Sequence, residues 1–413
     1  MAPDLRLARV VGRAGDIAGE WRSLVAHVLW VHEVGGSNPP SPTQVLLGQS
    51  RSDGRPRWTQ LRCGAVRITG TAQKDAWDRH VLPPVEQVRP GLWSVPVPVP
   101  INPLRYVLVY VLELDGGGVA LVDAGWDTQE AWDALTGGLE TLGAAIGDVR
   151  AVIVTHIHPD HYGLAGRVRE ASGAWIGLHP ADAALLTARY ADVDGLIAAM
   201  RALLVSCGVP AGTVPDLAEA SMQIRAFVST AQPDVLLEDG TTIDLAGWDL
   251  RTIWTPGHSP GHICLYSDTR RLLMSGDHVL PRITPNIAFH SQQVPNPLGD
   301  YLESLARMRH LTPEEVLPAH EYRFTGLRAR LEEIERHHAA RLDAIEAALE
   351  EHPGSTVWEL TTSLVWSRPW DETPAFMRRA ANGETLAHLV LLERQGRARR
   401  EPGTPACFYP AAR

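Results

Sequence analysis

A short stretch near the middle of the chain constrains its fold and chemistry more than any other. Residues 151–163 form an apolar run that continues into three histidines and one aspartate within six residues. Such apolar runs are typical of buried parallel strands. Alternate side chains of an extended backbone share a face, so His156 and His158 project together. The proline that follows forces a turn, which can bring Asp160 and His161 over the same pocket. Imidazole and carboxylate groups bind divalent zinc, iron or manganese, so the stretch predicts a metal site.

Composition narrows the class of protein. The chain has 413 residues, of which 45% are hydrophobic and 21% charged, as expected for two or three globular domains. A formal net charge of -10 argues against a dedicated nucleic-acid binder. Four scattered cysteines argue against a disulfide framework. There is no apolar run of the roughly 18 residues that a membrane span needs, and no secretory signal pattern, so we expect a cytoplasmic protein without a membrane partner.

The first 80 residues differ from the rest of the chain. They show no sustained hydrophobic period, and residues 35–43 are rich in glycine, proline and serine. We expect residues 1–80 to be a disordered leader, or the result of an upstream start-codon error with the product beginning near Val81 or Val85. On either interpretation we expect them to carry no function, and order to begin near Val88.

Residues 85–325 alternate strands with helices, which indicates an α/β domain. Apolar strands at 106–114 and 119–122 flank a glycine-rich turn, and 129–142 has helical spacing of apolar residues. Residues 181–227 are alanine-rich and interrupted by glycine and proline. We interpret them as a helical insertion over the active site, a place where specificity often lies.

Four further motifs follow predicted strands. They are Asp-Ala-Gly at 123–125, Thr-Pro-Gly-His-Ser-Pro-Gly-His at 255–262, Gly-Asp at 276–277 and Pro-Ala-His-Glu at 318–321. Together with the His-x-His-x-Asp-His stretch, and in this order, they resemble the signature motifs of the metallo-β-lactamase superfamily. The resemblance covers residues 90–325 and implies a four-layer αββα sandwich with the site along one edge.

The resemblance also implies roles for individual residues. One metal would be held by His156, His158 and His258, and a second by Asp160, His161 and His320, with Asp277 bridging the two. Asp123 and His262 match positions that support the ligands, although a turn-forming role for Asp123 is equally compatible with its sequence context. Two divalent metals about 3.5–4 Å apart can share a hydroxide, which Asp160 would orient as the catalytic residue. Zinc is the expected metal, with iron or manganese as alternatives. His179, His278 and His290 are not assigned as ligands.

Residues 326–413 form a distinct tail. Apolar residues at helical spacing over 327–349 predict a first helix, a capping box at Thr356 predicts a second, and 384–395 predicts a third before a short β-wing over 397–410. This order resembles the winged-helix domain of some lactamase-like hydrolases, including an endoribonuclease group. The tail holds 12 arginines and 13 acidic residues, so we favour a structural or dimer-capping role over nucleic-acid binding.

Three functions are compatible with these observations. The motifs look closest to glyoxalase II-like and lactamase-like hydrolases, so hydrolysis of a small-molecule thioester or ester by a metal-bridging hydroxide is the first expectation. A metal-dependent phosphodiesterase or endoribonuclease is the second. A metal-bound, non-catalytic nucleic-acid-binding regulator is the third, although a pure binding module has no need of seven donors.

Overall fold

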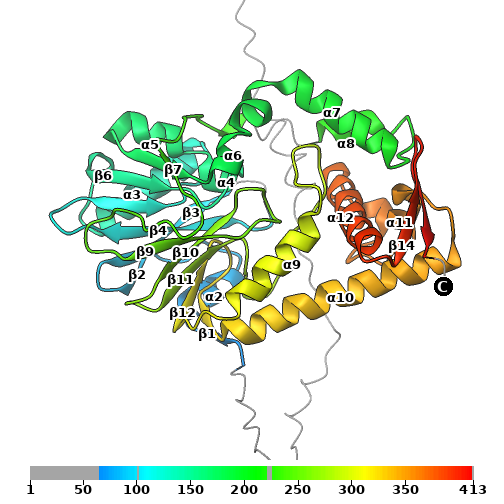
Figure 1. Ribbon diagram of the computed structural model, residues 1–413. Coiled ribbons are helices and arrows are strands. Elements are labelled where there is room, and N and C mark those ends of the chain that lie inside the picture. Colours follow the sequence, from blue (N-terminus) through cyan, green and yellow to red (C-terminus); the bar gives the residue numbers. More distant parts are fainter. Residues whose placement is uncertain (1–64, 100–101, 221–225, 412–413) are drawn as a thin grey trace, which may run out of the picture.

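Two β-sheets packed face to face form the centre of the molecule. The computed structural model describes residues 65–99, 102–220 and 226–411 (Figure 1). The seven-stranded sheet runs β2 (Glu86–Arg89), β3 (Leu92–Pro98), β4 (Tyr106–Glu113), β5 (Val119–Val122), β6 (Val149–Ile153), β7 (Trp175–Leu178) and β8 (Val235–Leu236). The six-stranded sheet runs β1 (Arg67–Ile68), β13 (Phe324–Thr325), β12 (Glu315–Pro318), β11 (Leu272–Gly276), β10 (Ile263–Ser267) and β9 (Leu250–Trp254).

Each sheet is buried on both faces. Along β10, Leu265 packs between the two sheets, whereas Cys264 and Tyr266 belong to the core on the opposite face. This alternation follows from the two-residue period of a strand. Helices α3 (Gln129–Thr141) and α5 (Ala165–Ser172) cover the seven-stranded sheet, and α9 (Pro297–Met308) and α10 (Leu327–Glu351) cover the six-stranded one. The predicted α/β sandwich is confirmed.

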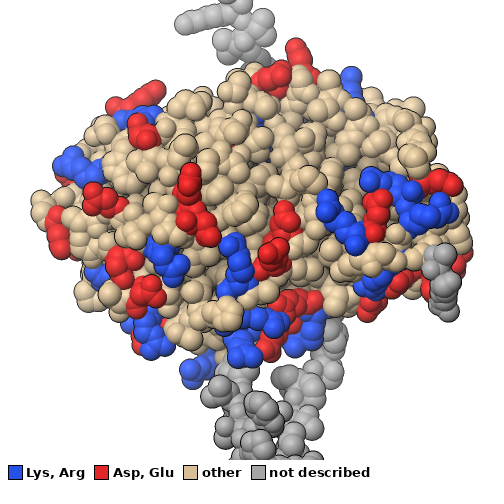
Figure 2. Space-filling view, in the orientation of Figure 1, with Lys and Arg blue, Asp and Glu red and all other residues tan. Residues whose placement is uncertain are grey.

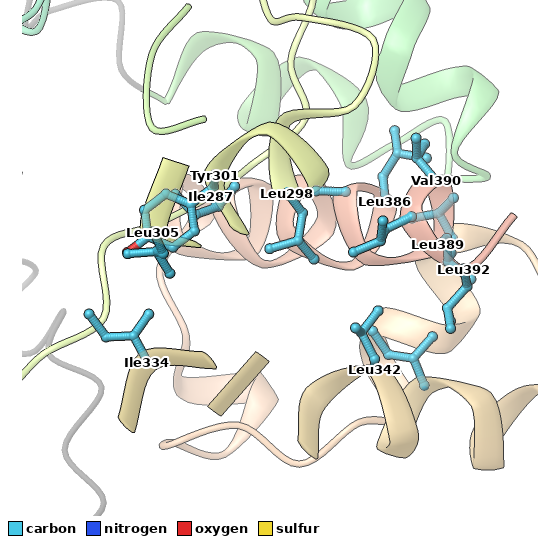
Figure 3. Close-up of a cluster of buried hydrophobic side chains, with 14 of the residues drawn as sticks. Ile287, Leu298, Tyr301, Leu305, Ile334, Leu342, Leu386, Leu389, Val390 and Leu392 are labelled. Carbon is cyan, nitrogen blue, oxygen red and sulfur yellow. The ribbon is translucent and has the colours of Figure 1, made fainter. Parts of the chain in front are cut away.

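The C-terminal region is a bundle of helices with a two-stranded ribbon. It consists of α10, α11 (Val357–Ser363), α12 (Ala375–Arg394), β14 (Ala398–Glu401) and β15 (Cys407–Pro410). The structure has the predicted capping box, in which Thr356 and Glu359 satisfy each other's backbone N–H groups. Apolar side chains of α9, α10 and α12 meet in one interior, among them Leu298, Ile334 and Leu389 (Figure 3). The region therefore shares a core with the sandwich, and the expected boundary at residue 326 falls at the start of a helix that belongs to both.

The insertion bridges the two halves of the molecule. It contains α6 (Pro180–Ala183), the short helical turn η2 (Thr187–Ala191), α7 (Val193–Ser206) and α8 (Val214–Glu219). Figure 1 shows α7 and α8 running along the top of the view from the sandwich to the C-terminal region, with α10 along the bottom. Backbone N–H groups of Trp358 and Ala406 donate to the carbonyls of Cys207 and Ser206 at 2.9 and 3.1 Å. These bonds fasten the end of α7 to α11 and to the ribbon.

The expected start of the folded domain is wrong. Residues 65–80 are part of the sandwich, because β1 pairs with β13 and α2 (Thr71–Asp78) packs on the sheet edge. Trp77 joins the core between the sheets, and the buried amide of Gln73 bonds to Ser94 and to the backbone of Arg323. The leader prediction for residues 1–64 lies outside the described residues. Within the described ranges, no helix combines the length and apolar character needed to cross a bilayer.

Candidate metal centre

The end of β6 and the turn after it supply four of the predicted donors. β6 ends at Ile153, and α4 (Pro159–Tyr162) begins five residues after Val154. The proline starts a helical turn because its fixed φ suits the first helical position. His156 Nε2 and His158 Nδ1 lie 2.9 Å apart, and the rings of His156 and His161 are 3.9 Å apart. The side chains of the stretch thus converge on one point at the sheet edge.

Asp123, at the end of the neighbouring strand β5, orients this group. Its carboxylate accepts a hydrogen bond from His161 Nδ1 at 2.8 Å. It also accepts from the backbone N–H and the hydroxyl of Thr155, at 2.8 and 3.0 Å. The backbone of Asp123 adopts a positive φ of 64° at the end of this strand. Its position beneath His161 matches the supporting place that the sequence resemblance implied.

The second sheet contributes His258, His262 and Asp277. His258 Nδ1 donates to the carbonyl of Asn286 at 3.0 Å, and its Nε2 lies 3.6 Å from Asp277. His262 Nε2 accepts from the backbone N–H of Asp277 at 3.1 Å, so its Nδ1 is the protonated nitrogen and donates to Thr255 at 2.8 Å. A Cβ on Gly276 would lie 2.7 Å from His262 Nε2, so this turn accepts glycine alone. His262 therefore positions Asp277.

His320 approaches from the loop after β12. Its Nδ1 donates to the carbonyl of Tyr106 at 2.8 Å, and its Nε2 lies 3.4 Å from Asp160 and 3.3 Å from Asp277. The hydroxyl of Tyr110 donates to the carbonyl of Pro318 at 2.9 Å. Strand β4 thereby holds His320 against the histidines that follow β6.

The seven donors form one cluster with the chemistry of a metal site. Three overlapping groups have their ligand atoms within 4.8 Å of one another, namely His156–His158–His258, His156–His161–Asp277 and Asp160–His161–His320. Nε2 of His161, His258 and His320 is buried without a hydrogen-bond partner. Each of these rings uses Nδ1 for an outer hydrogen bond, the arrangement by which proteins orient metal-binding imidazoles. Buried polar atoms are normally paired, so these nitrogens fit divalent metal ions.

The electrostatics of the seven-donor cluster suit metal binding. Burial, followed by neighbouring imidazoles, holds the pKa of His156 and His158 well below the ordinary value, so both rings are neutral donors. Burial alone would lower the pKa of His161, but Asp123, Asp160 and Asp277 outweigh it and raise that pKa. Burial opposes ionisation of Asp277, yet His320 and His161 hold its pKa well below the usual range. The carboxylates are therefore ionised around a compact group of imidazoles.

Asp182 is a structural residue of this site that sequence reasoning missed. It is buried at the start of α6, and Oδ2 accepts from the backbone N–H of Ile157 and from Ser259 Oγ, both at 2.8 Å. Its Oδ1 accepts from the N–H of Gly261 at 2.7 Å. One carboxylate thus joins the two loops that bear His158 and His258. Acidic residues are common in the first turn of a helix, where they interact favourably with the helix dipole. The sequence therefore gave no sign that Asp182 belongs to the site.

The remaining histidines near the motifs lie outside the donor groups. His179 caps α6 by accepting from the N–H of Ala181, and its ring stacks on Trp254. His278 packs edge-on to Tyr301 with ring centres 4.9 Å apart. His290 accepts a hydrogen bond at Nδ1 from the N–H of Gln292 at 3.3 Å. None of the three is among the grouped donors, in agreement with their treatment in the sequence.

Comparison with known proteins agrees with the fold. The family model described as "Metallo-beta-lactamase superfamily" matches residues 102–320. This match spans more than half of the chain and includes every predicted donor. The chain belongs to the metallo-β-lactamase superfamily.

One relative covers most of the chain, and another matches 34% of it. A probable metallo-hydrolase, YqjP of Bacillus subtilis, is 28% identical over 311 residues, which is 73% of this chain and 91% of the relative. The lactamase-like protein adaB of Aspergillus niger is 32% identical over 142 residues, and the match spans 42% of its length.

Solved structures show the same likeness over most of the chain. A metallo-beta-lactamase family protein from Thermus thermophilus is 34% identical, with a TM-score of 0.68 over 78% of this chain and 100% of that one. A beta-lactamase domain protein from Burkholderia ambifaria is 27% identical, with a TM-score of 0.65 over 79% of this chain and 94% of that one.

Proposed function

We propose that this metallo-hydrolase cleaves small acyl thioesters or esters at a centre of two divalent metal ions, with zinc as the expected metal. The observation that carries the proposal is the cluster of seven donors, three of whose imidazole nitrogens are buried without a hydrogen-bond partner. His156, His158 and His258 would hold one ion, and Asp160, His161 and His320 the other. Asp277 lies 3.6 Å from both His161 and His258 and 3.3 Å from His320, which suits a bridging ligand.

The chain's own residues supply orientation and proton handling. Bound divalent metals would lower the pKa of water to about 7 and polarise the substrate carbonyl. Asp160 places a carboxylate oxygen 3.4 Å from His320 and 3.8 Å from His161, at the point where an attacking water must be oriented. We assign to Asp160 the acceptance of that water's proton and its transfer toward the leaving thiolate or alkoxide.

A cysteine nucleophile is not favoured as an alternative. Burial raises the pKa of Cys264 to about 12, and burial also raises the pKa of Cys207. A protonated, buried thiol is a poor nucleophile. The acyl transfer is therefore assigned to water.

Cleavage of nucleic acid is less well supported than acyl hydrolysis. The arginines of the ribbon are neutralised by neighbouring carboxylates, because Arg397 pairs with Glu346, Arg399 with Glu401 and Arg400 with Glu393. Figure 2 shows acidic and basic side chains interspersed over this face of the molecule. A phosphate-backbone surface instead needs unneutralised basic groups.

Metal analysis combined with a substrate comparison tests the proposal. The purified protein should bind two metal ions per chain and hydrolyse an acetyl thioester, and a chelator should abolish turnover until metal is restored. His158→Ala and Asp277→Ala should lose bound metal and turnover together. His352→Ala, in an exposed residue at the end of α10, is the matched control and should behave like the unmodified protein. Full thioester turnover after metal removal, or metal-dependent cleavage of single-stranded RNA in place of the thioester, would contradict the proposal.

A further inference from the structure

A cavity of about 320 Å³ lies where the insertion, the loop before α9 and the C-terminal region meet. Its apolar wall includes Leu203 of α7, Phe289 of the loop, Phe408 of β15, and Leu386 and Val390 of α12 (Figure 3). None of the residues that line it is among the seven metal donors. Cavities of this size and lining are typical of sites for small ligands. The cavity is therefore a candidate binding site separate from the metal centre.

The wall of this cavity is poorly suited to hold water. A buried water molecule needs several polar partners. Among the lining residues, Ser206 carries the one hydroxyl group, and its Oγ already donates to the carbonyl of Leu203 at 2.7 Å. The buried thiol of Cys207 also lines the cavity, and a thiol forms only weak hydrogen bonds. An apolar group therefore fits the interior better than water does.

Three charged residues line the cavity on its solvent-exposed side. Arg394 is the last residue of α12 and Arg400 belongs to β14, and both are exposed. Arg400 Nη2 lies 3.2 Å from Glu393 Oε2, so these two charges compensate each other. Within the described part of the chain, the guanidinium of Arg394 forms no ion pair and no hydrogen bond. The entrance thus has a positive charge that no ion pair neutralises, in a chain of net charge -10.

The volume of the cavity limits the length of its ligand. A water-sized group occupies about 30 Å³ in a liquid, so the cavity holds roughly ten non-hydrogen atoms. Octanoate has this size, and it combines an alkyl chain for the apolar wall with a carboxylate for Arg394. A planar guanidinium group matches a carboxylate through two parallel hydrogen bonds. Size, apolarity and charge therefore favour the same kind of ligand.

The loop that lines the cavity also supports a metal donor. Phe289 and Pro295 of this loop line the cavity. In the same loop, the carbonyl of Asn286 accepts from His258 Nδ1 at 3.0 Å, and Gln293 Nε2 donates to the carbonyl of the residue before His258 at 2.9 Å. A ligand that contacts Phe289 and Pro295 therefore stabilises the loop conformation that holds His258.

We propose that this cavity binds a medium-chain aliphatic carboxylate such as octanoate, and that the bound ligand stabilises the loop that supports His258. The alkyl chain lies among Leu203, Phe289 and Phe408, and the carboxylate lies at Arg394. Coupling between two sites is reciprocal, so a ligand that stabilises this loop also tightens metal binding. The cavity is then a regulatory site. Its tests need no turnover, so they are independent of the hydrolase proposal.

Calorimetric titration of the metal-loaded, full-length protein tests the site itself. Octanoate should bind more tightly than butanoate by about tenfold or more, because each fully buried methylene contributes roughly fourfold in affinity. Leu203→Trp fills the cavity and should remove this preference. Val205→Trp is the matched control, because Val205 lies on the exposed side of the same helix and does not line the cavity. Equal octanoate affinity in the two variants would place the ligand elsewhere, for example at the metal ions, and would overturn the proposal.

A second variant tests the carboxylate and remains informative if Leu203→Trp does not fold. Arg394→Gln should weaken octanoate binding by about threefold to fivefold, the range of an exposed ion pair, and should leave the binding of neutral 1-octanol unchanged. Arg328→Gln is the matched control, since Arg328 is an exposed residue of α10 whose charge is paired with Glu332. Octanoate affinity that is the same in both variants would overturn the assignment of a carboxylate ligand.

The rate of metal release to a chelator tests the coupling. Saturating octanoate should slow release by about fivefold in the unmodified protein and in Val205→Trp, as is typical of coupled sites. Butanoate should have no such effect, and octanoate should have none in Leu203→Trp. Release rates that octanoate leaves unchanged in the unmodified protein would overturn the regulatory role.

Discussion

Asp182 is the single residue on which the relative position of the two histidine loops depends. Its carboxylate accepts three hydrogen bonds from Ile157, Ser259 and Gly261. Asp182→Ala would leave these donors buried and unsatisfied, so we expect a loss of about 3 kcal/mol in the free energy of unfolding. Urea denaturation and metal content measure the effect, and metal affinity should fall with stability. Asp244→Ala, in an exposed position of the same sandwich, should change neither quantity. Normal stability of the Asp182 variant would refute the role assigned to this carboxylate.

Glu384 makes the stability of the molecule depend on pH. Burial raises its pKa to about 7 from an ordinary 4.5, against the opposing charge of Arg341, whose Nε lies 3.5 Å away. A raised pKa in the folded state means that this residue stabilises the fold below the unfolded pKa and that the contribution disappears as pH rises through the folded pKa. We expect the melting temperature of the unmodified protein, relative to Glu384→Gln, to decrease from pH 5 to pH 8. Glu351→Gln, on the exposed end of α10, should show a constant difference.

Residues of the site differ in how far the sequence could identify them. The seven donors are visible because each follows a predicted strand and sits in a motif with fixed spacing, and the structure brings all seven together. Asp182 had no such signal. It reaches the site through contacts over long sequence separations, such as its hydrogen bond with Gly261. Spacing along the chain cannot encode contacts of this kind.

At the scale of elements, predictions succeeded where a helix or strand has an apolar face of its own. The long helix α10 illustrates this, because the apolar residues at helical spacing that predicted it are buried, from Leu327 to Leu349. The short helix α2 illustrates the opposite case. It has eight residues and no side-chain cap, and it is stabilised by long-range contacts of Trp77 and Gln73. Its existence depends on a surface that the rest of the fold provides.

Truncation at two positions tests the contribution of β1 and α2. A protein beginning at residue 65 keeps both elements and serves as the reference. One beginning at residue 81 loses Trp77, which packs edge-on to Tyr106 at 5.9 Å and stacks with Arg105 at 3.8 Å. Burying a tryptophan of this kind is worth about 3–5 kcal/mol, so the shorter protein should be much less stable. It should also bind metal more weakly, because Gln73 holds the loop just after His320. Identical melting curves for both truncations would show that α2 is dispensable.

The six-stranded sheet, the insertion and the C-terminal region form one packing unit in the described part of the molecule. A single apolar core includes Tyr266 of the six-stranded sheet, Leu204 of the insertion, Leu331 of α10 and Leu389 of α12. The sequence predicted three separate parts (residues 1–80, 85–325 and 326–413), because segments rich in glycine and proline and changes in hydrophobic periodicity mark local boundaries. Whether two such parts share a core depends on complementary surfaces, and hydrophobic periodicity does not reveal these.

Substitution of Gly208, at the end of α7, tests whether the insertion, the C-terminal region and the sandwich unfold together. Gly208 has a φ of +83°, and a Cβ there would lie 2.7 Å from the side chain of Thr356, which caps α11. Gly208→Ala should therefore cost about 1–3 kcal/mol through backbone strain and the clash. If the insertion, the C-terminal region and the sandwich unfold together, calorimetry should show one transition at a lower temperature, with release of bound metal shifted by the same amount. Gly212→Ala is the matched control, because nothing lies within 4 Å of its added Cβ. A separate early transition that leaves metal release unchanged would mean that the C-terminal region unfolds independently of the sandwich.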